Sequence, residues 1–184
     1  MGSTRFPGKV MADLDGKPMI GHLLDELKKC RRVDKVIVAI PDRQGEAPKP
    51  VLEQYLSSYI NWGDFHIVQG PENDVAGRFK IALGRFPCDY FIRVCADSPL
   101  ITAKEIDDLA KQQGSWLAQA ELPANTRFGQ PQIVKTEVFL KALPFFDDYD
   151  REHVTTFFTR RLVVDTPEDL DYVRRWIEFS KLLS

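Results

Sequence analysis

The amino-acid sequence predicts an α/β protein with a mostly parallel, Rossmann-like sheet that helices cover on both faces. One observation supports this class, and a second, the length of the chain, bears on the number of domains. Short apolar runs rich in β-branched residues alternate along the chain with segments of helical periodicity, an order typical of parallel strands joined by helical crossovers. The 184 residues suffice for one domain with its own core and are too few for two large ones. We therefore expect a single domain over residues 1–184.

Three strands and three helices are predicted to alternate in the first half of the chain. The apolar run at 33–40 is closed by Pro41 and Asp42, and the run at 89–95 (DYFIRVC) is the strongest strand signal in the sequence. A shorter strand is predicted between them, at 65–69. Apolar residues at helical spacing predict helices over 19–30, 50–60 and 74–86.

The second half of the chain is predicted to continue this alternation. Thr102 and Glu105 form a capping box that should open a helix. The remaining predictions are an irregular connection at 121–130, a strand and a short helix within 131–143, a last strand at 161–164 and a closing amphipathic helix at 167–183.

Composition and charge argue against several classes of protein. The formal net charge of −2 disfavours a nucleic-acid-binding protein, because phosphate contacts normally require an excess of basic residues. No apolar run approaches the roughly 20 residues of a membrane span, and the first residues lack the apolar segment of a signal peptide. The three cysteines have no C-x-x-C spacing and are predicted to be reduced core thiols. We therefore expect a cytoplasmic protein without nucleic-acid or membrane partners.

Residues 2–9 read G-S-T-R-F-P-G-K and are the most informative segment of the chain. Glycine and small hydroxyl residues allow backbone N–H groups to surround an anion. Arg5 offers a planar fork for phosphate oxygens and Lys9 a compact positive charge, while Pro7 and Gly8 fix the turn between them. The segment predicts a phosphate-binding loop, and the alternative on spacing alone is a flexible basic tail.

Two aspartates, Asp97 and Asp165, directly follow predicted strands. In open parallel sheets ligands bind outside the carboxyl ends of the strands, and Mg²⁺ prefers one or two carboxylates together with water and phosphate oxygens. If the two strands are neighbours, the two aspartates supply a magnesium site. Asp97 is also suited to a turn before Ser98 and Pro99, so a structural role stays an alternative for it. A capping box accounts for residues 166–169 but leaves Asp165 unexplained.

The order of these motifs resembles that of the cytidylyltransferase family. The chain begins with M-G-S-T-R-x-P-G-K, and D-x-x-G-K-P-M-I follows at 13–20. Four further runs match in the family's order, namely N-D-V-A-G-R-F at 73–79, R-V-C-A-D-S-P-L at 93–100, R-E-H-V-T at 151–155 and V-D-T-P-E-D-L at 164–170. The family includes acylneuraminate and keto-deoxy-octulosonate cytidylyltransferases, and the chain resembles its spore coat polysaccharide biosynthesis protein F group most.

The resemblance implies a fold of the nucleotide-diphospho-sugar transferase type. It also implies transfer of CMP from CTP to a sugar or sugar acid in surface polysaccharide biosynthesis, with release of pyrophosphate, Mg²⁺ as cofactor and a possible homodimer. The implied nucleotide-binding residues are Gly2, Ser3, Thr4, Arg5, Lys9 and Arg78. The implied catalytic residues are Arg5, Lys9 and Asp97, and the implied metal ligands are Asp97 and Asp165. From the residues alone, a solvated arginine on a helix stays an alternative for Arg78.

The chain departs from the family pattern in two places. In the family the phosphate-binding loop follows an apolar strand that ends in a further arginine, and this chain has no counterpart of that strand. Since the strand is central in such a sheet, its loss would leave its two neighbours with costly unpaired backbone groups. A start assigned late, another segment that fills the position, and a degenerate domain are the three explanations that stay open. The segment at about 117–150, which in the family completes the sugar site and the dimer contact, is shortened.

Two alternative functions stay open on the sequence. The departures from the family favour a catalytically degenerate nucleotide-binding or interaction subunit, whereas the retained Lys9 and Asp97 favour an active enzyme. A nucleotide-sugar glycosyltransferase of the same fold more often carries an Asp-x-Asp metal pair after the central strand. This chain has Ala96-Asp97-Ser98 at that position, which favours nucleotidyl transfer.

Overall fold

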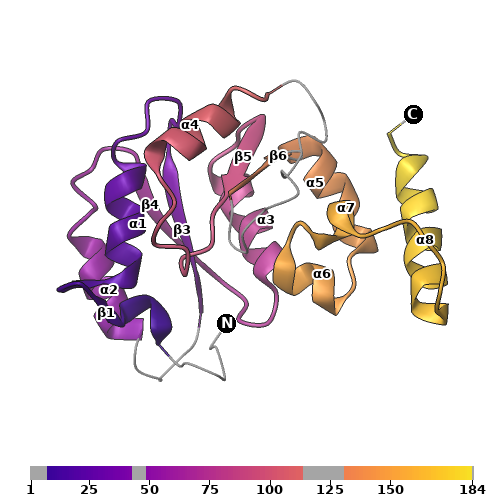
Figure 1. Ribbon diagram of the computed structural model, residues 1–184, viewed down its shortest axis with the longest axis horizontal. Helices are drawn as coiled ribbons and strands as arrows, with labels where there is room; N and C mark the ends of the chain where they lie inside the picture. Colours follow the sequence, from indigo (N-terminus) through magenta and orange to yellow (C-terminus); the bar gives the residue numbers. More distant parts are fainter. Residues whose placement is uncertain (1–7, 43–48, 114–130, 184) are drawn as a thin grey trace.

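The computed structural model of the chain describes residues 8–42, 49–113 and 131–183, in which strands and helices alternate (Figure 1). The strands are β1 (Asp13–Leu14), β2 (Lys17–Pro18), β3 (Val36–Pro41), β4 (Phe65–Gly70), β5 (Tyr90–Arg93) and β6 (Gln132–Lys135). The α-helices are α1 (Met19–Leu27), α2 (Lys49–Ser57), α3 (Val75–Arg85), α4 (Ala103–Ala110), α5 (Thr136–Ala142), α6 (Asp148–His153), α7 (Thr156–Thr159) and α8 (Pro167–Ser180). Two 3₁₀ helices are η1 (Lys9–Met11) and η2 (Leu143–Phe145). Within these residues, no helix has the length and apolar character that crossing a membrane requires.

A tight hairpin, β1–β2, connects η1 to α1. Asp15 and Gly16 form its two-residue turn with φ of 53° and 79°, and positive φ at both positions is typical of a type I′ turn. The Asp13 side chain accepts a hydrogen bond from the backbone N–H of Gly16 at 3.3 Å. The Asp-Gly pair encodes this hairpin locally, although no structure was predicted for it from the sequence.

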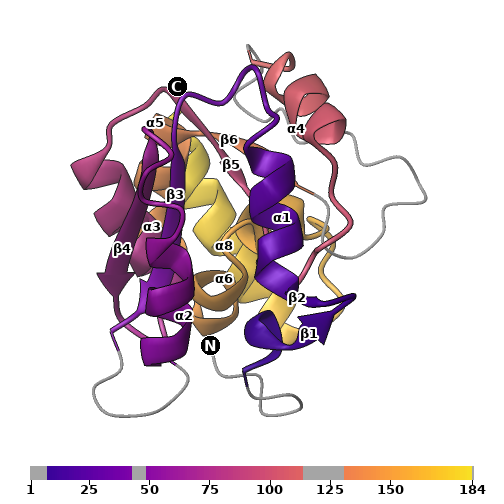
Figure 2. The ribbon, with the colours of Figure 1, turned by 90° about the vertical axis from the view of Figure 1, so that its left-hand side faces the viewer.

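β3 and β4 form a parallel pair, as the sequence predicts, with Val36 opposite Phe65 at its start and Pro41 opposite Gly70 at its end. α1 and α2 cover one face of the pair, because both helices bury side chains in one apolar cluster with the two strands (Figure 2). α3 contacts both strands from the other face. The buried members of the cluster are Ile20, Leu24, Val36, Ile40, Leu56, Tyr59 and Phe65.

β5 and β6 form an antiparallel pair in which Arg93 lies opposite Gln132. On one face β5 packs in an apolar cluster with α1 and α4. On the other face Phe91 lies edge-on against Phe139 of α5, with ring centroids 5.2 Å apart. Cys88, just before β5, is exposed, so the prediction of core thiols is wrong for this residue, which follows Pro87 in a turn rather than a strand.

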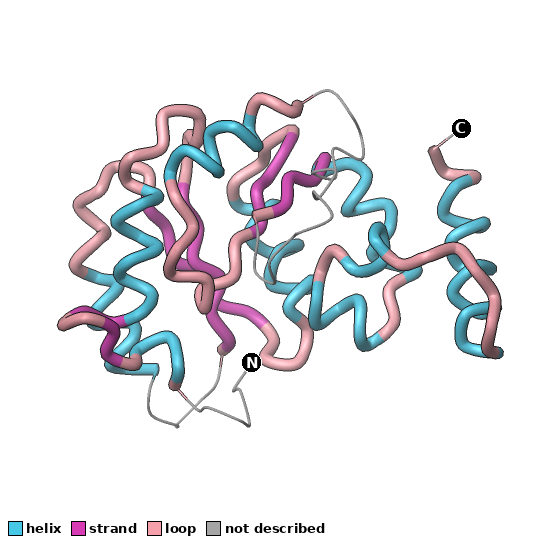
Figure 3. Tube along the Cα trace, viewed as in Figure 1, coloured by secondary structure: helices cyan, strands magenta, loops and turns pink. Residues whose placement is uncertain are grey.

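The predicted α/β class is confirmed, but the described strands lie in separate pairs rather than in one continuous sheet (Figure 3). In the described part of the chain, β3 pairs only with β4 and β5 only with β6. The backbone N–H groups of Val36 and Asp42 donate to carbonyls at β4, at 2.9 and 2.8 Å. Because donors alternate in direction along a strand, those of Ile37 and Ala39 point to the other edge. Among the described residues, no strand pairs with that edge, and the missing central strand stays a prediction.

The strand predicted at 161–164 is wrong, because these residues form an exposed loop between α7 and α8 (Figure 3). Leu162, Val163 and Val164 are 52%, 53% and 50% exposed. β-branched residues favour extended backbone, but a strand also requires a partner edge. Within the described residues, no strand pairs with this segment.

The helices α5 to α8 pack with α3 around an aromatic core that includes Phe139, Phe157 and Phe179, all fully buried. A charged network lies beside this core. Asp150, with 0% of its surface exposed, pairs with Arg160 at 3.2 Å and Arg175 at 3.3 Å. The network therefore joins α6 to the segment before α8 and to α8 itself.

Candidate functional site

Lys9 and Asp97, separated by 88 residues in the sequence, form an ion pair beyond the end of β5. Two local features bring them together. Gly8 has a φ of 69°, which other residues rarely adopt, and it turns the chain into η1. Val10 of η1 then packs in the same apolar cluster as Ala96, the residue before Asp97. Packing of their neighbours thus fixes the two charges beside each other.

Both charged groups reach the solvent, since the side chains of Lys9 and Asp97 are 33% and 38% exposed. A lysine ammonium is suited to a phosphate oxygen, and an aspartate carboxylate to a divalent cation. The structure therefore brings together two of the three residues predicted to be catalytic. The other predicted residues of the phosphate-binding loop lie outside the described residues; they are Gly2, Ser3, Thr4 and Arg5.

Arg78 is buried in the first turn of α3, with 5% of its surface exposed. Its Nη1 donates to the carbonyl oxygens of Pro71 and Glu72, at 2.6 and 2.9 Å, and so fixes the segment that precedes the helix. Burial lowers the pKa of the guanidinium from its usual value, and Nε has no hydrogen-bond partner within the described part of the chain. The interpretation of Arg78 as a solvated arginine is wrong, while its contact with the nucleotide stays a prediction.

Asp165 lies in the exposed loop before α8, where its backbone N–H donates to the Asp169 side chain at 3.1 Å. In Figure 1 the loop into α8 runs at the far side of α5–α7 from the β3–β4 pair. The structure does not bring Asp165 to Asp97, because the strand expected to carry it into the sheet does not form.

Asp97, the carboxylate beside Lys9, is suited to hold Mg²⁺ only together with a bound phosphate ligand. Within the described residues, no group of three or more His, Cys, Asp or Glu side chains could hold a metal ion by itself. Mg²⁺ usually keeps several waters and binds through one or two carboxylates plus phosphate oxygens. Asp97, a partly exposed oxygen donor, is therefore suited to a magnesium ion that is bound together with a triphosphate.

An ion pair that the sequence analysis missed joins two of the recognised motifs. Arg151 Nη1 lies 2.9 Å from Asp74 Oδ2, although the residues are 77 positions apart. Asp74 also caps α3, because its Oδ1 accepts from the Gly77 N–H at 2.8 Å. Both charges resemble solvated residues near helix ends, so their spacing in the sequence gives no signal of the contact.

A second missed arrangement lies at the end of β5. Arg93 Nη1 donates to Gln132 Oε1 at 3.1 Å, and Thr155 Oγ1 donates to the same oxygen at 2.5 Å. A charged residue inside the most apolar strand of the sequence was the one signal that could have revealed it. Polar groups at such positions are rarely retained without a partner or a function.

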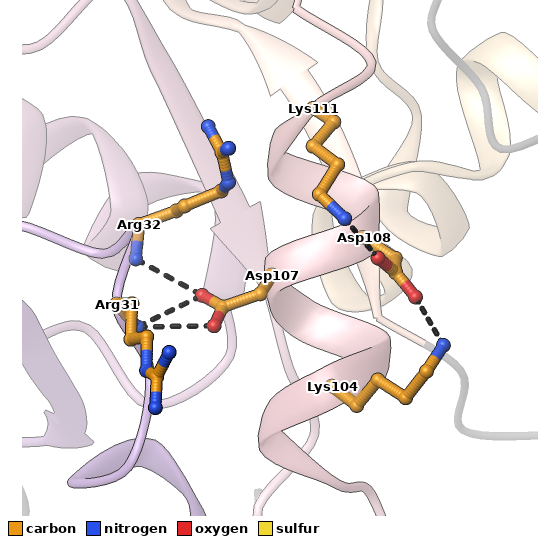
Figure 4. Close-up of a pocket in the computed structure, with 6 residues that line it drawn as sticks. All are labelled: Arg31, Arg32, Lys104, Asp107, Asp108 and Lys111. Atoms are coloured by element: carbon orange, nitrogen blue, oxygen red, sulfur yellow. Dashed lines mark hydrogen bonds and ion pairs between the residues drawn. The ribbon is translucent and has the colours of Figure 1, made fainter.

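A charged pocket lies between α1 and α4, away from this site (Figure 4). Its lining consists of Arg31, Arg32, Lys104, Asp107, Asp108 and Lys111. Asp107 accepts backbone N–H bonds from the turn after α1 at 3.0–3.1 Å, and Asp108 pairs with two lysines, which hold its pKa at about 2. The arginines precede β3, so the pocket lies near the amino end of that strand, opposite the end where such sheets bind ligands. We assign it no role in the chemistry.

The α/β fold, in which Asp97 follows β5 and meets Lys9 of η1, is of the nucleotide-diphospho-sugar transferase type. The sequence profile of the cytidylyltransferase family matches residues 1–164, which is most of the chain, and the chain belongs to this family. The recognition made from the motifs is therefore confirmed.

Known proteins agree with this family. A solved cytidylyltransferase structure from Leptospira borgpetersenii serovar Hardjo-bovis (strain JB197) matches with a TM-score of 0.68 over 100% of this chain and 91% of that chain, at 21% identity, which confirms the fold. A 3-deoxy-manno-octulosonate cytidylyltransferase from Pelobacter propionicus is 29% identical over 161 residues, 79% of this chain. One from Geobacter sulfurreducens is 27% identical over 198 residues, 98% of this chain.

The chain is shorter than these relatives. It spans 60% of the Pelobacter propionicus enzyme and 76% of the Geobacter sulfurreducens enzyme. A further relative with the same name, from Anaeromyxobacter sp. (strain Fw109-5), is 30% identical over 123 residues, which are 66% of this chain and 46% of that enzyme.

Proposed function

We propose that the protein transfers CMP from CTP to a sugar acid in polysaccharide biosynthesis, with release of pyrophosphate. The observation that carries the proposal is the ion pair of Lys9 with Asp97, which follows β5. It places a cation that can bind phosphate beside a carboxylate that can bind a metal ion. Membership of the cytidylyltransferase family supports it. The relatives are named for 3-deoxy-manno-octulosonate, which makes an acid of this kind the first acceptor to test.

The reaction assigned here needs no covalent enzyme intermediate. A hydroxyl oxygen of the acceptor forms a bond to the α-phosphorus of CTP and its proton passes to solvent. The bond from that phosphorus to the bridging oxygen breaks, and pyrophosphate leaves. Lys9 holds phosphate oxygens and stabilises the charge that develops on them. Asp97 holds the proposed Mg²⁺, which when bound supplies further charge neutralisation at the phosphates. Arg5 is proposed to assist Lys9.

The activity test is release of pyrophosphate from CTP with a panel of sugar acids, 3-deoxy-manno-octulosonate first. Lys9→Ala is expected to lower the rate about 10²–10³-fold, by analogy with the loss of one charge-stabilising donor. Lys111→Ala, which removes an exposed lysine of the pocket between α1 and α4, is the matched control and should keep the full rate. Equal rates for Lys9→Ala and the control would refute the assignment of Lys9.

Nucleotide binding can be tested separately from turnover. Ligand at 100 times its dissociation constant adds about 2.7 kcal/mol to the folded state, so CTP with Mg²⁺ should raise the melting temperature visibly. CTP binding without pyrophosphate release from any sugar acid would favour a degenerate nucleotide-binding subunit. No shift with any of the four ribonucleoside triphosphates would refute the nucleotide site.

The same proposal includes a homodimer that works in the cytoplasm. Exposed apolar side chains on and beyond α8 support self-association; they are Leu170, Ile177 and Leu182, at 40%, 49% and 50% exposure. Light scattering of the purified protein tests the dimer, and a monomer mass would contradict it.

The state of Cys30 is compatible with the proposed cytoplasmic location. Burial raises the pKa of the Cys30 thiol to about 11, which keeps the thiol protonated and slow to oxidise.

A further inference from the structure

The Arg93 guanidinium is a half-buried positive charge with no carboxylate partner among the described residues. Its side chain donates from Nη1 to Gln132 Oε1 at 3.1 Å and also hydrogen-bonds the Cys95 thiol. A guanidinium carries several N–H donors in a planar fork, so contacts with a neutral amide and a thiol leave the other donors available. Half-buried cations are normally matched by an anion.

A rigid arrangement holds this guanidinium in place. Gln132 Oε1 also accepts from Thr155 Oγ1 at 2.5 Å, and Thr155 is buried. Thr155 follows Val154, which has a φ of 66° and a ψ of −47°, and the Thr155 N–H donates to the His153 carbonyl at 2.7 Å. This is a γ-turn with positive φ at a fully buried β-branched residue, a strained conformation that such residues rarely adopt.

Strain of this kind persists only where the surroundings enforce it, and it is commonly found at functional sites. Here the strained turn presents the Thr155 hydroxyl to Gln132, which in turn orients Arg93. Two other segments of the chain, β6 and the turn at Thr155, therefore orient one guanidinium, an arrangement that a merely solvated arginine does not need.

Arg93 is close to the Lys9–Asp97 pair along the chain. Asp97 follows Arg93 by four positions, and at about 3.3 Å per residue their Cα atoms lie within about 13 Å. The partly buried Cys95 lies between them. The Arg93 side chain hydrogen-bonds this thiol, so the guanidinium lies next to the segment that leads to Asp97.

We propose that Arg93 binds the carboxylate of the acceptor sugar acid, and this proposal rests on the proposed function. In the transfer of CMP the acceptor has to approach the α-phosphorus, and therefore lies next to Lys9 and Asp97. An arginine fork matches a carboxylate with two parallel hydrogen bonds, which lysine cannot reproduce. Arg93 then selects acids over neutral sugars and orients the attacking hydroxyl.

The test is calorimetric titration of the protein, saturated with CMP so that no turnover occurs, with 3-deoxy-manno-octulosonate and with an N-acylneuraminate. Each acid is compared with its neutral carboxamide. Arg93→Met is expected to weaken binding of the recognised acid about 10–100-fold, the range of one charge-assisted hydrogen-bonded contact, and to leave carboxamide binding unchanged. Arg93→Lys should recover only part of the loss.

Arg85→Met, which removes an exposed arginine at the end of α3, is the matched control and should bind the acid as the wild type does. Equal weakening of acid and carboxamide by Arg93→Met would overturn the proposal in favour of a structural role. Loss of CMP binding in that variant would instead assign Arg93 to the nucleotide phosphate and also overturn it. Failure of the wild type to bind either acid would do the same. Acid binding without pyrophosphate release would refute the proposed function alone.

Discussion

Lys9 and Asp97 share one ion pair, and this sets up a competition at the scale of single residues. A phosphate oxygen that takes Lys9 competes with Asp97, whereas a divalent cation held by Asp97 releases Lys9. Metal and triphosphate are therefore expected to strengthen each other's binding, beyond the ordinary effect of charge neutralisation.

Asp97→Asn should strengthen the binding of CTP in the absence of metal about three- to tenfold, because the change frees Lys9 and removes a negative charge near the triphosphate. Calorimetric titration with CTP in excess EDTA measures the effect. Lys9→Met distinguishes the freeing of Lys9 from the removal of a negative charge. If the freed lysine matters, Lys9→Met should weaken metal-free CTP binding about fivefold more in the Asp97→Asn variant than in the wild type. Strictly additive effects of the two substitutions would contradict the competition.

The sequence was sufficient to identify candidate site residues whose role depends on their immediate neighbours in the chain. Lys9 lies in a glycine-containing turn and Asp97 directly follows a strand, so both were predicted and both lie together. The chain from Arg93 through Gln132 to Thr155 was not predicted, because it depends on contacts across 39 and 23 residues. The burial of Arg78 was left open because an arginine in a helix is usually solvated, although Val75, Ile81 and Ala82 on the same face of the helix are apolar.

At the scale of elements, one edge of β3 pairs with β4, and no described strand pairs with the other, which we call the open edge. The Val38 and Ile40 N–H groups share the direction of Val36, which donates toward β4, whereas those of Ile37 and Ala39 point away from it. Protection from hydrogen exchange should therefore alternate along the strand.

The amides of Ile37 and Ala39 are expected to exchange at least about tenfold faster than those of Val38 and Ile40, because only the second pair has to open before it exchanges. Hydrogen exchange followed by nuclear magnetic resonance measures this residue by residue. Uniform protection along β3 would show that another segment pairs with the open edge.

Most elements were predictable, because their signals are periodicity and caps. β3, β4 and β5 and the helices α1, α2, α3, α4 and α8 all lie where the sequence predicts them, within a few residues at their ends. The loop at 161–164 was not predictable from its residues, since Leu162, Val163 and Val164 favour a strand in isolation. Whether such a run pairs depends on an available edge elsewhere in the fold, and the sequence does not reveal that edge.

At the scale of the whole molecule, α8 is attached to the rest by aromatic packing and by the charged network around Asp150. Asp147 belongs to the same network, with Arg160 at 3.1 Å and Arg175 at 2.9 Å. Burial acts to raise the pKa of Asp147, but the Asp150 N–H and the Arg160 guanidinium outweigh it and hold the pKa at about 2.

A folded-state pKa below the unfolded value of 3.8 stabilises the protein above about pH 4, and this contribution is lost as the pH falls toward 2. Since the side chain is 37% exposed, the contribution is reduced by solvent to about 1 kcal/mol. Asp147→Asn should therefore lower the free energy of unfolding by about this amount at pH 7 and by nearly nothing at pH 2.

Urea denaturation at pH 7, 4 and 2 compares the wild type with Asp147→Asn. Asp148→Asn, an exposed aspartate of α6, is the matched control. If Asp147→Asn lowers the free energy of unfolding by the same amount at pH 7 and at pH 2, the side chain stabilises the protein by its shape rather than by its charge.

The open edge of β3 also bears on how molecules meet one another in solution. An unpaired strand edge is a template on which a second chain can add a strand, and long flat edges of this kind promote aggregation. This edge is short. Within β3 it offers the N–H and carbonyl groups of Ile37 and Ala39 before Pro41, which has no N–H to give. A neighbouring molecule gains few hydrogen bonds there, so an edge of this length is a weak template for aggregation.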